Sequence, residues 1–128
     1  MQSKTAPHLI LVHTSAVSVE EGAPAPGRIL AGHPVNRTWN VFEGPDGQFF
    51  SGIWESEPGA WRIEYTEAEF CHIMEGVSRI TSDDGLSVTL RAGDAFVIPS
   101  GFRGTWEVVA RTRKHYAIYL PGGAGAGA

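Results

Sequence analysis

The 128-residue chain has only one cysteine, Cys71, and lacks any apolar run long enough to span a membrane. One cysteine excludes a disulfide framework within the chain and a metal cluster built from several thiolates. A membrane span needs about 18 apolar residues, and a secretory signal also needs a longer run than the four residues Leu9–Val12 near the N-terminus. We therefore expect a cytoplasmic protein with no membrane partner, in which Leu9–Val12 forms a buried strand.

Positive charge is scarce. Ten lysines and arginines stand against 14 aspartates and glutamates, which gives a net charge of −4. Surfaces that bind nucleic acids or anionic lipids are usually basic. The composition therefore predicts no nucleic-acid partner and favours a small-molecule ligand.

A sustained helical period is missing as well, whereas the chain has 16 glycines and 8 prolines. Frequent glycines and prolines divide a chain into short elements and favour strands and turns. Short aromatic and β-branched segments bounded by turn residues predict nine strands. They are Thr38–Phe42, Gln48–Trp54, Trp61–Tyr65, Phe70–Met74, Val77–Thr81, Ser87–Leu90, Ala95–Ile98, Thr105–Val109 and His115–Leu120. This number and spacing are typical of an antiparallel, all-β sandwich or barrel in a single domain.

The regions on either side of the predicted barrel differ from it. Residues 1–36 hold the apolar segment Leu9–Val12 and a Pro/Gly-rich stretch, Glu20–Pro34. The stretch predicts an irregular arm or a set of edge contacts, and an arm of this kind either packs on a neighbouring subunit or forms an ordered surface loop. Residues 37–120 form the barrel, and the Gly/Ala tail 121–128 is expected to be disordered. An unpaired apolar edge invites pairing across a two-fold axis, so we expect a homodimer.

Two segments resemble the two motifs of the cupin family. The first is Gly59–Gly76, GAWRIEYTEAEFCHIMEG, with Glu69 seven positions before the final glycine, and the second is Gly93–Gly104, GDAFVIPSGFRG. Over roughly residues 37–120 the chain is most similar to short single-domain cupins of the ureidoglycine aminohydrolase type. The resemblance implies a double-stranded β-helix, a small jelly roll whose barrel mouth holds the ligand.

The same resemblance implies a metal centre of three histidines and a glutamate, a donor set that suits manganese, iron, zinc or nickel. Aligned on Gly76, the four ligand positions fall on Ile63, Tyr65, Glu69 and Gly104. One ligand of the four is kept, so aminohydrolase activity is not carried over. We expect any divalent metal to bind weakly, with Glu69, His72 and His115 as the candidate ligands.

Glu69 is the leading candidate for chemistry, with Tyr65 beside it. Strand alternation places both in a barrel lined by aromatic and aliphatic side chains, where a carboxylate can act as a general acid or base. The alternative is a structural carboxylate bonded to Tyr65 or to a backbone amide. The predicted ligand-binding residues are Trp61, Ile63, Cys71, Trp106 and Lys114.

The alternation of side chains along a strand also predicts which of the remaining candidate residues face the barrel interior. His72 is expected to face away from Glu69, and only one of the adjacent pair Lys114 and His115 can point inward. Cys71 shares the face of Glu69 and is either a ligand contact or a small core residue.

Three functions remain open. The first is a barrel that binds a small polar metabolite beside a non-standard metal site. The second is a metal-dependent enzyme on a small molecule, similar to an aminohydrolase or isomerase. The third is a ligand-sensing or structural dimer module without turnover.

Overall fold

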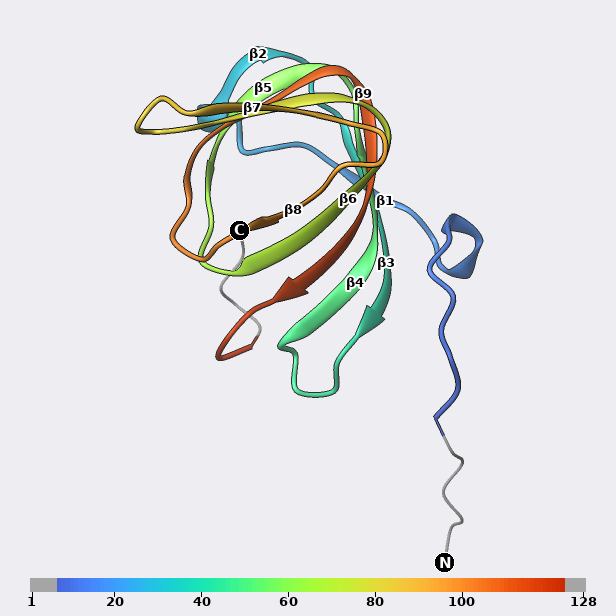
Figure 1. Ribbon diagram of the computed structural model, residues 1–128. Helices are drawn as coiled ribbons and strands as arrows, with labels where there is room; N and C mark the ends of the chain where they lie inside the picture. Colours follow the sequence, from blue (N-terminus) through green and yellow to red (C-terminus); the bar gives the residue numbers. More distant parts are fainter. Residues whose placement is uncertain (1–6, 124–128) are drawn as a thin grey trace, which may run out of the picture.

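The computed structural model describes residues 7–123 and contains nine strands and two short 3-10 helices (Figure 1). In chain order these are η1 (Thr14–Ala16), β1 (Glu20–Gly22), η2 (Pro26–Arg28), β2 (Ile29–Gly32), β3 (Asn36–Glu43), β4 (Phe49–Ser56), β5 (Gly59–Glu64), β6 (Ala68–Ser82), β7 (Ser87–Arg91), β8 (Ala95–Ile98) and β9 (Arg103–Tyr119). The predicted all-β, single-domain barrel is confirmed. Most of the predicted tail, 121–128, lies outside the described residues.

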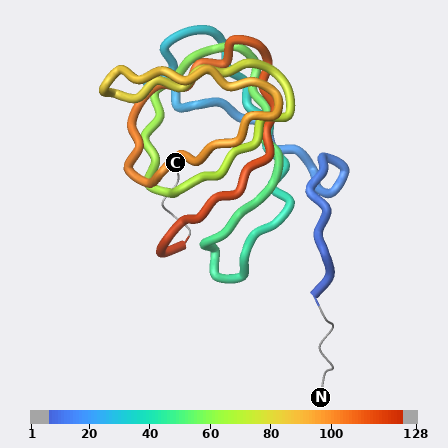
Figure 2. The backbone as a smooth tube through the Cα atoms, viewed as in Figure 1, coloured from blue at the N-terminus to red at the C-terminus, as the bar shows by residue number. Residues whose placement is uncertain are grey.

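Two long strands, β6 and β9, connect the two walls of the barrel. The first wall also holds β1, β3, β4 and β8, and the second wall also holds β2, β5 and β7. They pair with each other from Ala68↔Tyr119 to Ser82↔Gly104. β4 pairs with the C-terminal half of β9, and β5 pairs with its N-terminal half. β8 and β7 pair in the same way with the two halves of β6. The chain therefore curls into a barrel around the β6–β9 pair (Figure 2).

A bulged region bends this pair. The register between β6 and β9 shifts three times between Ile73 and Ser78, and Gly76 adopts a positive φ of 95°. Bulges bend a strand and increase its twist without ending it. For this reason the segments predicted as separate strands are joined. Phe70–Met74 and Val77–Thr81 lie in β6, and Thr105–Val109 and His115–Leu120 lie in β9, except that the strand ends at Tyr119.

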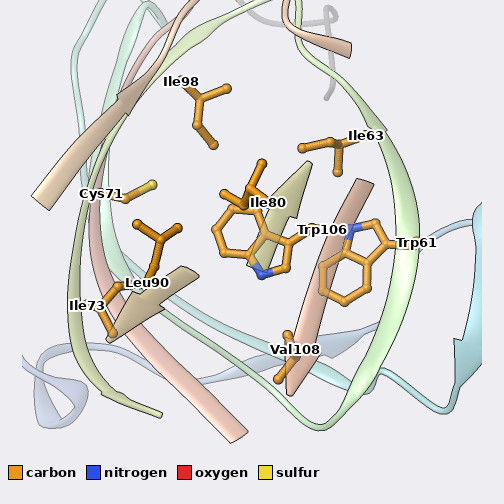
Figure 3. Close-up of a cluster of buried hydrophobic side chains, with 9 residues drawn as sticks. All are labelled: Trp61, Ile63, Cys71, Ile73, Ile80, Leu90, Ile98, Trp106 and Val108. Atoms are coloured by element: carbon orange, nitrogen blue, oxygen red, sulfur yellow. The ribbon is translucent and has the colours of Figure 1, made fainter. Parts of the chain in front are cut away.

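Nine buried side chains fill the interior (Figure 3). They are Trp61, Ile63, Cys71, Ile73, Ile80, Leu90, Ile98, Trp106 and Val108. The rings of Trp61 and Trp106 are stacked, with centroids 6.3 Å apart. Figure 3 shows these side chains pointing inward from facing parts of the barrel, as strand alternation predicts.

The region before the barrel agrees with one expectation and corrects another. The segment Glu20–Pro34, predicted as an irregular arm or a set of edge contacts, contributes the edge strands β1, which pairs with β3, and β2, which pairs with β5. The prediction of a buried strand at Leu9–Val12 is wrong: this segment forms no strand, and Leu9 is 95% exposed. No helix within residues 7–123 has the length and hydropathy needed to cross a membrane.

The bend at Gly76 predicts that one added methyl group at this position destabilises the fold strongly. A Cβ at this position would lie 2.0 Å from the carbonyl oxygen of Arg111, and φ is positive. We expect Gly76→Ala to lower the free energy of unfolding by roughly 3 kcal/mol, because backbone strain and overpacking add. Urea denaturation measures this loss.

Gly85→Ala is the matched control. Gly85 has nearly the same φ, 96°, but nothing lies within 4 Å of its added Cβ. It should lose only the strain contribution, about 1 kcal/mol. Equal losses in the two variants would contradict the role of the close approach to Arg111.

Candidate functional site

The register of the first wall sets the inward side chains in rows across the strands. Trp54 on β4 pairs with Lys114 on β9, so their side chains lie side by side in the barrel. In the next row, Gly52 separates Asn40 from Tyr116. The Tyr116 hydroxyl crosses this glycine and donates to Asn40 Oδ1 at 2.6 Å. A Cβ at Gly52 would lie 2.7 Å from that hydroxyl, so the missing side chain makes the bond possible.

A lysine ammonium lies inside the barrel. Lys114 Nζ donates to Glu69 Oε2 at 2.9 Å and to Cys71 Sγ at 3.4 Å. It also lies 4.3 Å from the ring centroid of Trp106 and 4.7 Å from that of Trp54. Lys114 is 3% exposed and Glu69 is 4% exposed. The cation is therefore held by one carboxylate and by the faces of two indole rings, which attract cations through their quadrupoles.

The second oxygen of Glu69 is also bonded. The Tyr65 hydroxyl donates to Glu69 Oε1 at 2.8 Å, which is the bond that the structural alternative anticipated. The ion pair with Lys114 was not foreseen. Strand alternation could place Lys114 inside the barrel, but only the register of β6 against β9 brings it to Glu69.

Burial and charge together set the protonation states here. Burial lowers the pKa of Lys114, but the neighbouring Cys71 and Glu69 groups raise it by more, so the net pKa is raised. Burial and the charge of Glu69 hold the pKa of Tyr65 well above its usual value. Burial likewise raises the pKa of Cys71 to about 12. Near neutral pH the site holds an ammonium ion, a neutral phenol and a neutral thiol.

A cavity of about 520 Å³ lies beside the ion pair. Six of the predicted site residues line it: Trp61, Ile63, Tyr65, Glu69, Trp106 and Lys114. The seventh, Cys71, is fully buried in the core and contacts Lys114 of the site through its sulfur. Residues Ala23, Pro24 and Ala25, between β1 and η2, also line the cavity. The Pro/Gly-rich segment therefore closes one side of the site.

Sequence reasoning missed a polar row on β3. Asn36, Thr38 and Asn40 all line the cavity, and Asn36 Oδ1 is buried without a hydrogen-bond partner among the described residues. A signal was present, because these three polar residues occupy alternate positions of one strand and therefore share one face. The pattern is inverted relative to an ordinary core strand, with the polar face turned inward.

A second buried carboxylate is explained by the fold. Glu55, 2% exposed, accepts hydrogen bonds on the outer face of the same wall from Arg37, Arg111 and Arg113, the last at 2.7 and 2.9 Å. Burial raises the pKa of Glu55, but Arg113 and the other arginines lower it by more. This cluster ties β3, β4 and β9 together outside the barrel.

Residues 43–116 match the family model described as the EutQ-like cupin domain. The chain belongs to the EutQ-like cupin domain family. The finer resemblance to the ureidoglycine aminohydrolase type is not shown. A search among curated proteins found no match to this cupin.

Solved structures share the fold of this EutQ-like cupin. A DUF861-family protein of unknown function from Pseudomonas syringae pv. tomato is 24% identical, with a TM-score of 0.73 over 80% of this chain and 44% of that chain. The EutQ protein of Clostridium difficile is 22% identical, with a TM-score of 0.61 over 70% of this chain and 71% of that chain. A predicted oxalate decarboxylase from Thermotoga maritima is 16% identical, with a TM-score of 0.66 over 87% of this chain and 99% of that chain. This cupin thus spans less than half the length of the Pseudomonas protein.

The residues at the cupin ligand positions do not fit a divalent metal. Ile63 is a core side chain, and a Cβ at Gly104 would lie 2.1 Å from the carbonyl oxygen of Thr81. Tyr65 and the ammonium of Lys114 already occupy both oxygens of Glu69. An ammonium ion is not a metal ligand and repels a cation. Within residues 7–123, no three His, Cys, Asp or Glu side chains are grouped as a metal site requires.

The two candidate histidines meet each other rather than Glu69. His72 pairs with His115 across β6 and β9, and their Nδ1 atoms are 3.3 Å apart. Their neighbours Cys71 and Lys114 point inward, so both histidines lie on the outer face of the wall. Burial and the proximity of His72 lower the pKa of His115.

The buried ion pair between Lys114 and Glu69 predicts that removing one of the two partners destabilises the fold strongly. Lys114→Met keeps the length of the side chain but leaves the Glu69 carboxylate unpaired in the barrel. We expect the free energy of unfolding to fall by about 3–5 kcal/mol at pH 7. The double variant Lys114→Met/Glu69→Gln should recover most of this loss, because no buried charge remains. Denaturant titration of the three proteins tests this, and a double variant no more stable than Lys114→Met would contradict it.

The raised pKa of Lys114 also predicts a pH dependence. A raised pKa in the folded state gives stability that is complete below the ordinary lysine value of 10.5 and is lost as pH rises through the higher folded value. We expect the stability difference between the parent and the double variant to change only above about pH 10.5. Thermal unfolding from pH 7 to 12 measures it, and a change confined to pH 7–9 would argue against the ion pair.

Proposed function

We propose that this barrel binds a small polar metabolite at the Lys114–Glu69 ion pair, with the ammonium in place of a metal ion. The observation that carries the proposal is a buried ammonium on the wall of a cavity. Removing two charges from water is costly, and apolar residues of similar volume often stabilise an interior as well or better. A buried ion pair beside a cavity is therefore better explained by recognition than by stability.

The remaining hydrogen-bonding capacity suggests the ligand class. A lysine ammonium has three N–H donors, of which Glu69 and Cys71 accept two. The third suits a carbonyl or carboxylate oxygen of a ligand. Asn36 Oδ1, buried without a partner among the described residues, suits an N–H or O–H donor.

The spacing of these two groups limits the size of the ligand. Asn36 lies on β3 and Lys114 on β9, with β4 between them. Neighbouring strands are about 4.8 Å apart, so the two backbones are about 10 Å apart across the sheet. A molecule of several heavy atoms spans that gap. We infer a small hydroxy- or amino-substituted carbonyl compound or carboxylic acid, packed against Trp54 and Trp106.

An enzyme in which Glu69 and Tyr65 move a proton is the second candidate. The 2.8 Å bond between the two groups favours it, because it is short enough for proton transfer. The raised pKa of Tyr65 keeps the phenol protonated and makes it a donor rather than a base. A metal-dependent aminohydrolase or isomerase is not supported by the donor set described above.

The binding test uses a panel of small hydroxy and amino acids and their carbonyl analogues, read by thermal shift and then by calorimetry. We expect at least one compound to stabilise the parent. Asn36→Ala should weaken its binding about tenfold, or about 1.4 kcal/mol, through the loss of one hydrogen bond. The double variant Lys114→Met/Glu69→Gln should remain folded and lose binding entirely.

Arg79→Gln is the matched control, because it removes an exposed ion pair with Glu107 that lies outside the cavity lining. It should alter neither stability nor binding appreciably. Binding that survives unchanged in the double variant would overturn the proposal. Turnover of the bound compound by the parent, lost in Tyr65→Phe, would favour the enzymatic candidate.

A further inference from the structure

One row of residues across the first wall carries a charged side chain at each end. Glu20 on β1 pairs with Thr38 on β3, which pairs with Trp54 on β4. Trp54 in turn pairs with Lys114 on β9. Residues paired in this way lie on the same face of a sheet, and all four line the cavity of about 520 Å³. The row therefore places a carboxylate at the edge of the wall and an ammonium further in, both at one cavity.

Glu20 differs from the other carboxylates of this cavity. Three more glutamates line it, and each has an ion pair or a hydrogen bond within the chain: Glu64, Glu67 and Glu69. The side chain of Glu20 has no ion-pair or hydrogen-bond partner among residues 7–123, and it is exposed. Its negative charge is therefore available to a ligand.

The charge of Glu20 acts inside the cavity. Burial and the charges of Glu69 and Glu20 raise the pKa of the Tyr116 hydroxyl, which belongs to a side chain that lines the cavity and is 5% exposed. A charge perturbs a buried group in this way only when it is close and poorly screened by water. The Glu20 carboxylate therefore faces the cavity.

A buried acceptor lies on the same face as Glu20. Asn36 is two residues before Thr38 on β3, so the two side chains point to the same side of the strand. Asn36 Oδ1 is buried without a hydrogen-bond partner among the described residues. An ammonium ion has three N–H donors, which suit the Glu20 carboxylate together with the Asn36 oxygen.

We propose that the site takes an ω-amino acid, a zwitterion whose ammonium and carboxylate groups lie at opposite ends of a short chain. The identity of this ligand rests on the proposed function, in which the ligand binds at the Lys114–Glu69 ion pair. The ligand carboxylate accepts the third N–H of Lys114, and the ligand ammonium pairs with Glu20. The methylene chain between them lies against the ring of Trp54.

The separation of the two charges favours an ω-amino acid over an α-amino acid. β1 and β9 are three strand steps apart, which is about 14 Å at about 4.8 Å a step. Lys114 Nζ is held by Glu69 on β6, which neighbours β9 on the side away from β1. An α-amino acid carries both charged groups on one carbon and engages only one of the two partners. A chain of methylene groups separates them and buries apolar surface on the indole ring.

Calorimetric titration with three five-carbon acids tests the proposal. δ-Aminovalerate has separated charges, norvaline has both charges on one carbon, and valerate has no amine. We expect the parent to bind δ-aminovalerate about fivefold more tightly than valerate, the size of effect typical of an ion pair at an exposed carboxylate. Norvaline should bind more weakly than δ-aminovalerate. Titration with γ-aminobutyrate and ε-aminocaproate then gives the preferred chain length.

Glu20→Gln removes the charge, and Glu21→Gln is the matched control. Glu21 is the next residue on β1, pairs with Arg37 at 3.1 Å and is absent from the cavity lining. In Glu20→Gln the preference for δ-aminovalerate over valerate should disappear, while valerate binds as it does to the parent. Glu21→Gln should keep the preference. Both ligands are compared on the same variant, so a general loss of stability does not affect the ratio.

The possible failures separate the ligand identity from the proposed function. Equal binding of δ-aminovalerate and valerate by the parent, tighter binding of norvaline, or a preference that persists in Glu20→Gln would overturn the ω-amino acid and leave the binding site at Lys114 in place. A preference lost equally in Glu21→Gln would also overturn it, because net charge rather than Glu20 would then be responsible. A parent that binds none of these acids and no compound of the earlier panel would overturn both proposals.

Discussion

The pairing of β6 with β9 is the constraint on which the rest of the structure depends. This ladder contributes to both walls and bends where its register shifts around Gly76. The same ladder places Glu69 on one strand close to Lys114 on the other, with Cys71 between them. The closure of the barrel and the geometry of its ion pair therefore have a single cause.

Two of the buried glutamates, Glu55 and Glu69, show how position decides what a carboxylate does. Glu55 lies on the outer face among three arginines, and these charged partners compensate its burial. Glu69 lies inside with one lysine and one tyrosine, between aromatic walls and a cavity. Attraction is stronger in that less polar setting, and so is the cost of any unpaired charge. The inner pair is therefore the one suited to recognise a ligand.

Strand periodicity was enough to predict many of the residues that line the cavity. Trp61, Ile63, Tyr65, Glu69 and Trp106 were predicted to share the barrel interior, and all of them line the cavity. Alternation works here because a side chain's face depends only on its own strand. Asn36 could have been found in the same way, since it shares a face with Thr38 and Asn40, but a polar inward face does not stand out when apolar residues are used to find the core.

The sequence by itself determined the all-β class, most of the strand positions and which residues point inward, because these depend on local propensity and period. Only the tertiary structure decided that Lys114 pairs with Glu69, because the pairing of β6 with β9 joins segments that are 45 residues apart. It likewise decided that Gly104 leaves no room for a ligand and that His72 meets His115 instead. Leu9–Val12 shows the same division: its composition indicates a strand, but a strand needs a neighbour with free backbone groups, and the chain's own fold places none beside it.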